Sequence, residues 1–237
     1  MITIENLRKS YGKLQVLKDV SVCFGAGKVV SVIGPNGAGK TTLSKCILGM
    51  VLPESGNIKI GGESILKKYA YRSQIGYMPQ IGKYPENMKI RQVIEMIRDI
   101  RKDVKEVDEE LIGLYGLQEM YDKRMGALSG GTKQKVSAAL AFMFNPQILI
   151  LDEPTAGLDP ISAEILKGKI LKEKKNGKLI LITSHVMSEI EEVADEVLCI
   201  VDGSIRFYET IADLKAQTHE DRLSRAVAKI MSEGYTS

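Results

Sequence analysis

The sequence predicts an α/β fold with a mostly parallel core sheet and helices on both faces, and two observations predict it. Three runs, at residues 29–33, 148–151 and 179–183, are apolar at nearly every position, which is typical of parallel strands that are covered on both sides. A glycine-rich loop at residues 34–41 joins the first of these strands to a segment with helical spacing. With 237 residues, 44% of them hydrophobic, the chain is long enough to bury one sizeable core.

The elements outside this core follow from other patterns. Alternating apolar residues in Met1–Leu7 and Val20–Phe24 predict half-buried antiparallel strands at the N-terminus. From about residue 84 to 127 the pattern becomes helical, and the apolar positions of its two segments are Ile90, Val93, Ile94, Ile97 and Ile100, then Leu111, Leu114 and Leu117. A third helical stripe comprises Ile161, Ile165, Leu166 and Ile170. A last one, within 219–233, comprises Leu223, Val227, Ile230 and Met231, and the sequence does not decide whether it packs on its own domain or joins a dimer contact.

The glycine-rich loop, Gly34-Pro-Asn-Gly-Ala-Gly-Lys-Thr41, matches the phosphate-binding pattern G-x-x-x-x-G-K-[ST]. Its glycines let the backbone fold around an anion, and the following helix presents its positive dipole end to the same anion. Lys40 is placed to meet the β- and γ-phosphates of a nucleotide, and Thr41 to hold Mg²⁺. A chance glycine-rich turn is the alternative, and the flanking strand and helix argue against it. The predicted nucleotide contacts are Gly34, Pro35, Asn36, Gly37, Ala38, Gly39, Lys40, Thr41 and Thr42.

A second motif is the apolar run from Gln147 that ends in Asp152 and Glu153. This arrangement places one carboxylate at Mg²⁺ and a second beside the attacking water. Taken alone, it could also be a buried strand that ends in a solvated acidic turn. The order of further motifs decides between the two: Leu128-Ser-Gly-Gly131 before it, then Gly157-Leu-Asp159 and Thr183-Ser-His185.

Together these motifs resemble the nucleotide-binding subunit of ATP-binding cassette (ABC) transporters, over roughly Met1 to Leu214. The resemblance implies a P-loop ATPase of the ABC type that uses ATP and Mg²⁺. It implies a single domain with an N-terminal antiparallel β subdomain. The nucleotide-binding core would comprise residues 1–83 and 128–214, the inserted helical subdomain 84–127, and a C-terminal helical extension 215–237. The helical subdomain would dock a membrane-spanning partner.

The resemblance also implies roles for individual residues. Tyr11 would stack on adenine, although an exposed strand-end tyrosine is the alternative. Gln80 would contact Mg²⁺ and water, with a surface glutamine as the alternative. His185 would hydrogen-bond the γ-phosphate. The implied catalytic residues are Glu153, His185 and Gln80, and the implied metal ligands are Thr41, Gln80 and Asp152.

Ser129, Gly130 and Gly131 differ from the other motifs because the resemblance implies that they act on the nucleotide of another subunit. They open a helix whose N-terminus can receive a γ-phosphate. One chain would thus make two half-sites, which predicts a head-to-tail homodimer or a heterodimer with a similar chain. The chain departs from the common family pattern at Thr132, where glutamine is more usual, and we expect tuning of the contact rather than its loss.

Composition limits the other function classes. A net charge of +3 is too balanced to argue for nucleic acid, and the lysines of residues 167–175 predict a solvated helix face, with a nucleic-acid patch as the alternative. Cys23, Cys46 and Cys199 are interpreted as reduced core residues rather than metal ligands or disulfides. We expect no signal peptide, and no apolar run approaches the ~20 residues that span a bilayer. The resemblance therefore implies a permease on a separate chain as the partner, and a peripheral position at the cytoplasmic face of the inner membrane.

Three functions compete. The first is the ATPase of a membrane transporter, the second a soluble ABC-type ATPase acting on DNA or ribosomes, and the third a regulator that does not hydrolyse ATP, which Glu153 argues against. For cargo, residues 75–88, 144–148 and 164–167 are most similar to the Nos-type ATPase linked to copper-site maturation of nitrous oxide reductase. That resemblance implies a periplasmic partner. Export of a drug, lipid or polysaccharide is the alternative.

Overall fold

The computed structural model describes residues 1–233. The chain forms two compact units: unit 1 comprises residues 1–72 and the C-terminal part from residue 179, and unit 2 comprises residues 73–178. The helices predicted between residues 84 and 127 belong to unit 2. The boundaries of the core and helical subdomains that the resemblance implies stay a prediction.

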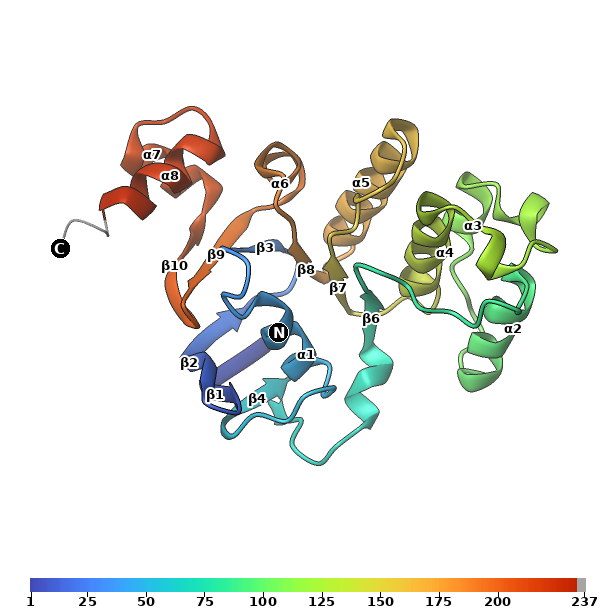
Figure 1. Ribbon diagram of the computed structural model, residues 1–237, viewed down its shortest axis with the longest axis horizontal. Helices are drawn as coiled ribbons and strands as arrows, with labels where there is room; N and C mark the ends of the chain where they lie inside the picture. The colour runs from blue at the N-terminus through green and yellow to red at the C-terminus, as the bar shows by residue number, and fades with distance from the viewer. Residues whose placement is uncertain (234–237) are drawn as a thin grey trace. The chain divides into compact units, whose positions relative to one another are not determined.

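Unit 1 begins with an antiparallel sheet in the order β2-β1-β4-β5 (Figure 1). Its strands are β1 (Ile2–Tyr11), β2 (Leu14–Phe24), β4 (Ser55–Ile60) and β5 (Glu63–Ser64). Ile2 at the start of β1 lies opposite both Phe24 and Ile60. The predicted N-terminal antiparallel strands are confirmed, and both extend beyond the alternating runs that indicated them.

Unit 1 also contains strands in the order β10-β9-β3-β8. They are β3 (Val29–Ile33), β8 (Leu179–Thr183), β9 (Glu196–Val201) and β10 (Ser204–Thr210). Strand β3 is parallel to both neighbours, and β10 is antiparallel to β9. Every residue of β3 and β8 is buried, as continuous apolar runs predict.

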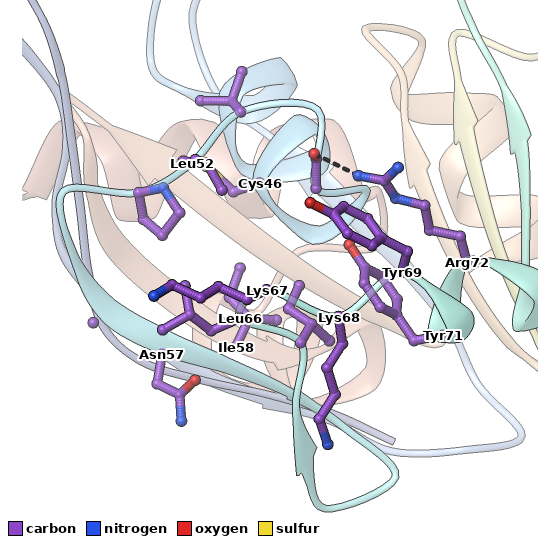
Figure 2. A pocket seen from close by; sticks show the side chains of 15 residues that line it. Cys46, Leu52, Asn57, Ile58, Leu66, Lys67, Lys68, Tyr69, Tyr71 and Arg72 are labelled. Atoms are coloured by element: carbon purple, nitrogen blue, oxygen red, sulfur yellow. Dashed lines mark hydrogen bonds between the residues drawn. The ribbon is translucent and has the colours of Figure 1, made fainter.

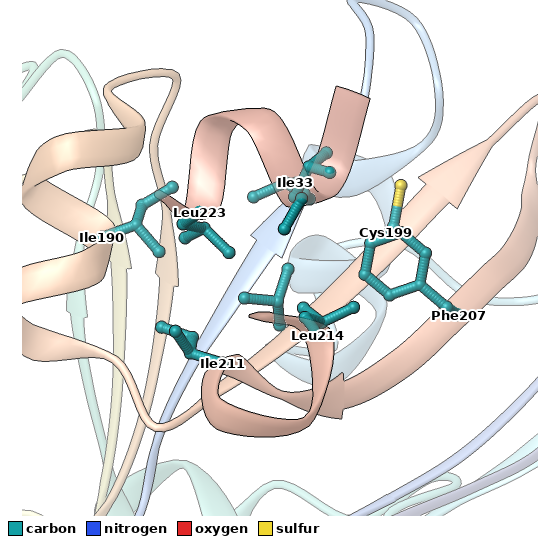
Figure 3. Close-up of a cluster of buried hydrophobic side chains, with 10 residues drawn as sticks. Ile33, Ile190, Cys199, Phe207, Ile211, Leu214 and Leu223 are labelled. Carbon is teal, nitrogen blue, oxygen red and sulfur yellow. The ribbon is translucent and has the colours of Figure 1, made fainter. Parts of the chain in front are cut away.

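The helices of unit 1 are α1 (Lys40–Ile47), α6 (Met187–Val193), α7 (Ile211–Thr218) and α8 (Leu223–Glu233). Leu214 and Leu223, from α7 and α8, join a buried cluster that contains Ile33 at the end of β3 (Figure 3). The C-terminal stripe therefore packs on its own unit. Residues 234–237 of the predicted extension lie outside the described residues.

Unit 2 pairs two parallel strands, β6 (Ile75–Met78) and β7 (Ile148–Asp152). Its α-helices are α2 (Ile90–Ile100), α3 (Glu110–Leu114), α4 (Gly130–Phe142) and α5 (Pro160–Lys175). Short 3₁₀ turns are η2 (Leu117–Met120) and η3 (Met125–Ala127), and η1 (Ala70–Gln74) crosses the boundary between the units. The predicted stripe of α2 is buried at Ile90, Val93 and Ile94, but Ile100 is exposed at the helix end.

The predictions for α5 are wrong at Ile161 and Lys169, and the side chain of Lys167, also predicted on the solvated face, is only 13% exposed. Ile161 is 75% exposed, because the first turn of α5 directs it to solvent. Lys169, predicted on a solvated face, is only 4% exposed. Its ammonium contacts carboxylates of Asp108, Glu110 and Glu173, and this pairing makes its burial possible.

The cysteine interpretation is correct for two of three residues. Cys46 and Cys199 are buried thiols, and burial raises the pKa of each to about 11. Cys23 is exposed, because it points away from the buried face of β2 that carries Val22 and Phe24. Within residues 1–233, no cluster of His, Cys, Asp or Glu could hold a metal ion by itself, and no helix has the length and apolarity needed to cross a membrane.

Candidate functional site

The glycine-rich loop leaves β3 through a tight turn that only glycine allows. Gly34 has φ 144°, and a Cβ there would lie 2.0 Å from the carbonyl oxygen of Ile200. Gly39 has φ 108°, and a Cβ there would lie 2.7 Å from the carbonyl oxygen of Val16. Both glycines are therefore required by contact with neighbouring backbone, not only by their dihedral angles.

Lys40 is the first residue of α1 and is 8% exposed. Its Nζ donates to the carbonyl oxygens of Gly34, at 2.6 Å, and Pro35, at 3.0 Å. The loop thus curls around the ammonium group. The first turn of α1 contains no acidic residue, and its N-cap Gly39 has no side chain that could occupy the N–H groups. An ammonium and a helix N-terminus in one loop favour binding of an anion.

The remaining loop residues differ in exposure. Pro35, Asn36, Gly37 and Thr41 are exposed, Gly34 and Thr42 are half-buried, and Ala38 and Gly39 are buried. The Thr41 hydroxyl is therefore accessible beside the buried Lys40.

Unit 1 brings His185 to the same sheet edge as this loop. Strands β3 and β8 are parallel, with Val32 opposite Thr183, so their carboxyl ends meet. The Ser184 hydroxyl accepts from the N–H of Val186 at 3.1 Å and fixes the turn after β8. His185 lies in that turn and is exposed.

Tyr11 ends β1 in the hairpin with β2, opposite Leu14, and is 49% exposed. The Nζ of Lys9 lies 5.5 Å from the centre of its ring. The same hairpin contributes Val16, whose carbonyl lies against Gly39. Tyr11 therefore belongs to the hairpin that borders the glycine-rich loop.

In unit 2, the parallel strands β6 and β7 bring Gln80 and the acidic pair to one edge, because Met78 lies opposite Leu151. Asp152 ends β7 and is 8% exposed. The pKa of Tyr77 is raised by the burial of Tyr77 itself and by the negative charge of Asp152. Glu153 follows with φ 49°, an uncommon conformation for this residue type. Gln80 is exposed in the loop after β6.

The serine–glycine segment starts α4. Ser129 is the N-cap, and its hydroxyl accepts from the N–H of Thr132. A Cβ on Gly131 would lie 2.5 Å from the carbonyl oxygen of Gly157, whereas one on Gly130 would meet no described atom within 4 Å. The helix start is therefore packed on one side by the segment at Gly157 and open at Gly130.

Two contributors to this region of unit 2, Gln134 and Lys135, were not predicted from the sequence. The Nε2 of Gln134 donates to the carbonyl of Glu153 at 3.3 Å, and Lys135 forms a 2.9 Å ion pair with Asp159. Lys135 and Ser162 hold the pKa of Asp159 well below its usual range. The hydroxyls of Ser129 and Thr132 lie 2.9 Å apart. Positions 134 and 135 fall one turn after the serine–glycine segment, which is the only sequence signal for them.

A pocket of about 170 Å³ in unit 1 lies elsewhere (Figure 2). Its lining is mostly apolar and includes Cys46, Leu52, Ile58 and Tyr69. One wall is fixed by Arg72, whose Nη2 donates to the carbonyl of Gly49 at 2.8 Å. None of the predicted site residues lines this pocket, so it has no part in phosphate binding.

Comparison with known proteins supports the resemblance. A family model described as "ABC transporter" matches residues 17–156. The lipopolysaccharide export system ATP-binding protein LptB of Haemophilus influenzae is 36% identical over 213 residues, which are 86% of this chain and 88% of LptB. The linearmycin resistance ATP-binding protein LnrL of Bacillus subtilis is 32% identical over 240 residues, 99% of this chain and 77% of LnrL.

A solved structure described as an ATP binding subunit of an ABC transporter superposes with a TM-score of 0.87 and 26% identity, over 98% of this chain and 99% of that one. The predicted fold class is thereby confirmed. The Nos-type resemblance finds no support in these relatives, which are named for lipopolysaccharide export and linearmycin resistance. The names of the relatives favour the alternative of export.

Proposed function

The chain belongs to the ABC transporter family, whose ATP-binding subunits hydrolyse ATP, and from this premise we propose that it powers export of a lipid-, glycan- or drug-like molecule. Relatives named for lipopolysaccharide export and linearmycin resistance support this class of cargo. We propose that the chain acts at the cytoplasmic face of the membrane, bound to a membrane-spanning subunit on another chain. A docking surface on residues 84–127, and a periplasmic partner, stay predictions.

The observation that carries the ATPase proposal is the closure of the glycine-rich loop around Lys40. Carbonyl oxygens of Gly34 and Pro35 hold its ammonium, which orients this charge inside the loop. Phosphate oxygens of ATP would accept from the same ammonium and from the N–H groups at the start of α1. Tyr11 would then stack on adenine beside this loop.

The residues proposed as metal ligands suit Mg²⁺, which prefers oxygen donors and keeps several waters. They offer a hydroxyl at Thr41, an amide oxygen at Gln80 and a nearly buried carboxylate at Asp152. One protein carboxylate is enough for this ion when the nucleotide supplies the other charges. When bound, Mg²⁺ neutralises charge on the β- and γ-phosphates.

Glu153 is proposed as the residue that orients or deprotonates water, and His185 as a donor to the γ-phosphate. A carboxylate in this role must hold one direction within hydrogen-bond reach of water. The backbone of Glu153 is left-handed and its carbonyl accepts from Gln134, so the backbone that carries this carboxylate is held in one conformation.

Ser129, Gly130 and Gly131 are proposed to bind the γ-phosphate held by a second subunit. The open side at Gly130 and the lack of acidic residues in the first turn of α4 support this role. The functional unit would then be a head-to-tail dimer with two ATP sites. Each chain contributes one glycine-rich loop and one serine–glycine segment.

The test compares Lys40→Ala with Glu153→Gln. Lys40→Ala should lose ATP binding in titration calorimetry. Glu153→Gln should bind ATP while turnover falls by roughly 10²–10⁴-fold, as for lost general-base catalysis. With the membrane subunit that copurifies, Glu153→Gln should also stop transport without reducing copurification. Unchanged turnover in either variant contradicts the assigned roles, and transport that continues without turnover contradicts the proposed function.

A further inference from the structure

We propose that Thr132 is a positioning residue that fixes the Ser129 hydroxyl as a hydrogen-bond donor to the phosphate of the partner's nucleotide. The inference rests on the proposed function, in which Ser129 acts across the dimer. It assigns a purpose to the one position in the serine–glycine segment where the chain departs from the common family pattern.

The geometry around Ser129 is specific. The Thr132 N–H donates to the Ser129 Oγ at 3.2 Å, and the two hydroxyl oxygens lie 2.9 Å apart. A serine hydroxyl has one proton to donate and two lone pairs to accept. The Thr132 N–H uses one lone pair, and the Thr132 hydroxyl can use the other. Ser129 then has only its proton left for a further partner.

The opposite polarity, with Ser129 donating to Thr132, would use up that proton. A phosphate oxygen beside Ser129 favours the polarity in which Thr132 donates to Ser129, because the phosphate oxygen accepts a hydrogen bond and cannot donate one. A hydrogen bond from a hydroxyl to a charged oxygen is stronger than one between two neutral hydroxyls. Binding of an anion therefore turns the Ser129 proton outward, and the Thr132 hydroxyl then donates to the second lone pair of Ser129.

The surroundings leave this direction open. Ser129 is exposed, and a Cβ added at Gly130 would meet no described atom within 4 Å. The first turn of α4 contains no acidic side chain that could compete for the Ser129 proton. The Ser129 proton can therefore turn from Thr132 toward an anion that approaches from outside the described chain.

The test uses ATP-dependent dimerisation in the Glu153→Gln background, followed by light scattering against ATP concentration. Ser129→Ala should raise the midpoint by about 10–100-fold, the loss expected for a hydrogen bond to a charged group. Thr132→Val keeps the shape and has a similar helix propensity but lacks the hydroxyl, and it should raise the midpoint by about 3–10-fold. Thr132→Ser, which restores the hydroxyl, should return the midpoint to that of the parent.

The double variant Ser129→Ala with Thr132→Val isolates the mechanism. If Thr132 acts through Ser129, the double variant should match Ser129→Ala alone. An added effect of Thr132→Val without Ser129, or no effect of it with Ser129, overturns the inference and leaves the dimer model standing. No effect of Ser129→Ala overturns the proposed role of the segment itself. Equal thermal melting of all variants excludes unfolding, and Thr132→Ala replaces Thr132→Val should the latter melt early.

Discussion

Single residues in this chain are constrained by backbone neighbours as much as by chemistry. Glu153 has a left-handed backbone, and its carbonyl accepts from Gln134 and from the N–H of Ala156. This turn sends the chain out of β7 directly after Asp152, so two adjacent acids face different surroundings. Such strain is typical of functional positions, since the surrounding structure must hold it in place.

Adjacent glycines at the start of α4 give a matched pair for a stability prediction. An Ala at Gly131 would bring Cβ to 2.5 Å from the carbonyl of Gly157, and we expect overpacking to lower stability by about 1–3 kcal/mol. An Ala at Gly130 meets open space and should leave stability unchanged or raise it by up to about 1 kcal/mol, as for Gly→Ala in helices. Thermal and urea unfolding of the two variants measure the difference.

The same pair separates folding from function. If Gly130→Ala is at least as stable as the parent, glycine is retained there for a reason other than folding. Approach of a phosphate to the backbone is such a reason. Equal destabilisation by both substitutions would contradict the packing difference between the two sides of the helix start.

Among the elements, α5 depends on a buried charge network. Lys169 and Glu173 have side chains that are 2% and 3% exposed, and Lys178 pairs with Glu173 at 2.5 Å. Burial would lower the pKa of Lys169, but contacts with Asp108, Glu110 and Glu173 raise it. Burial would raise the pKa of Glu173, but Lys178 and Lys169 lower it. Each charge is tolerated only because its partners are present.

Removing the central charge should therefore destabilise the chain strongly. Lys169→Met leaves its carboxylate partners short of one cation, and we expect a loss of about 3–5 kcal/mol at neutral pH. Lys172→Met, at a side chain that is 56% exposed, is the control and should change stability by less than about 1 kcal/mol. Urea unfolding at several pH values provides the measurement.

The pH dependence of this network has a definite sign. The folded-state pKa values of Glu110 and Glu173 are lowered, so their contribution is complete above the unfolded pKa of about 4.3. It is lost as pH falls through the folded pKa values. The deficit of Lys169→Met should therefore shrink below about pH 4, where the carboxylates become neutral. A deficit that stays constant between pH 7 and pH 3 would show that packing, rather than charge, holds Lys169.

Prediction from sequence succeeded where one local pattern determines an element. Continuous apolar runs gave β3 and β8 with their observed bounds, and the glycine spacing indicated the loop around Lys40. It failed where the decisive partner is distant along the chain. Lys169 can be buried because its ammonium pairs with Asp108, which is 61 residues away in the sequence. The helical pattern around Lys169 contains no information about that partner. The Gln134 and Thr132 contacts likewise depend on turn geometry that spacing does not encode.

At the scale of the whole molecule, the C-terminal helices extend the core to the phosphate loop. Ile33, the residue before Gly34, is packed in the cluster that contains Leu214 from α7 and Leu223 from α8. Glu191 of α6 accepts from the N–H of Leu223 and pairs with Lys215. Helices α7 and α8 therefore pack against Ile33, the residue before the glycine-rich loop, and also contact α6, the helix that follows His185.

At an ATP concentration between the dimerisation midpoints of the parent and of Ser129→Ala, the dimer model predicts complementation between two chains that are each inactive alone. In a head-to-tail dimer, each ATP site combines Lys40 of one chain with Ser129 of the other. A dimer of one Lys40→Ala chain and one Ser129→Ala chain then has one site with both defects and one site with none. Mixing the two variants should restore about a quarter of the parental turnover, since half of random dimers are mixed and each has one intact site.

The control places both substitutions on one chain and mixes it with the parent. Those mixed dimers carry one defect in each site, so the only turnover should come from parental dimers, again about a quarter when the chains are equal. Turnover of the separate components distinguishes the two mixtures. In the first mixture, neither single variant turns over ATP alone under these conditions, whereas in the control mixture the parent alone is fully active. Varying the ratio of Lys40→Ala to Ser129→Ala at a constant total concentration should give turnover that rises from zero, passes through a maximum near equal amounts, and falls again. A mixture that stays as inactive as its components would show that a single chain, or a head-to-head pair, holds each complete site.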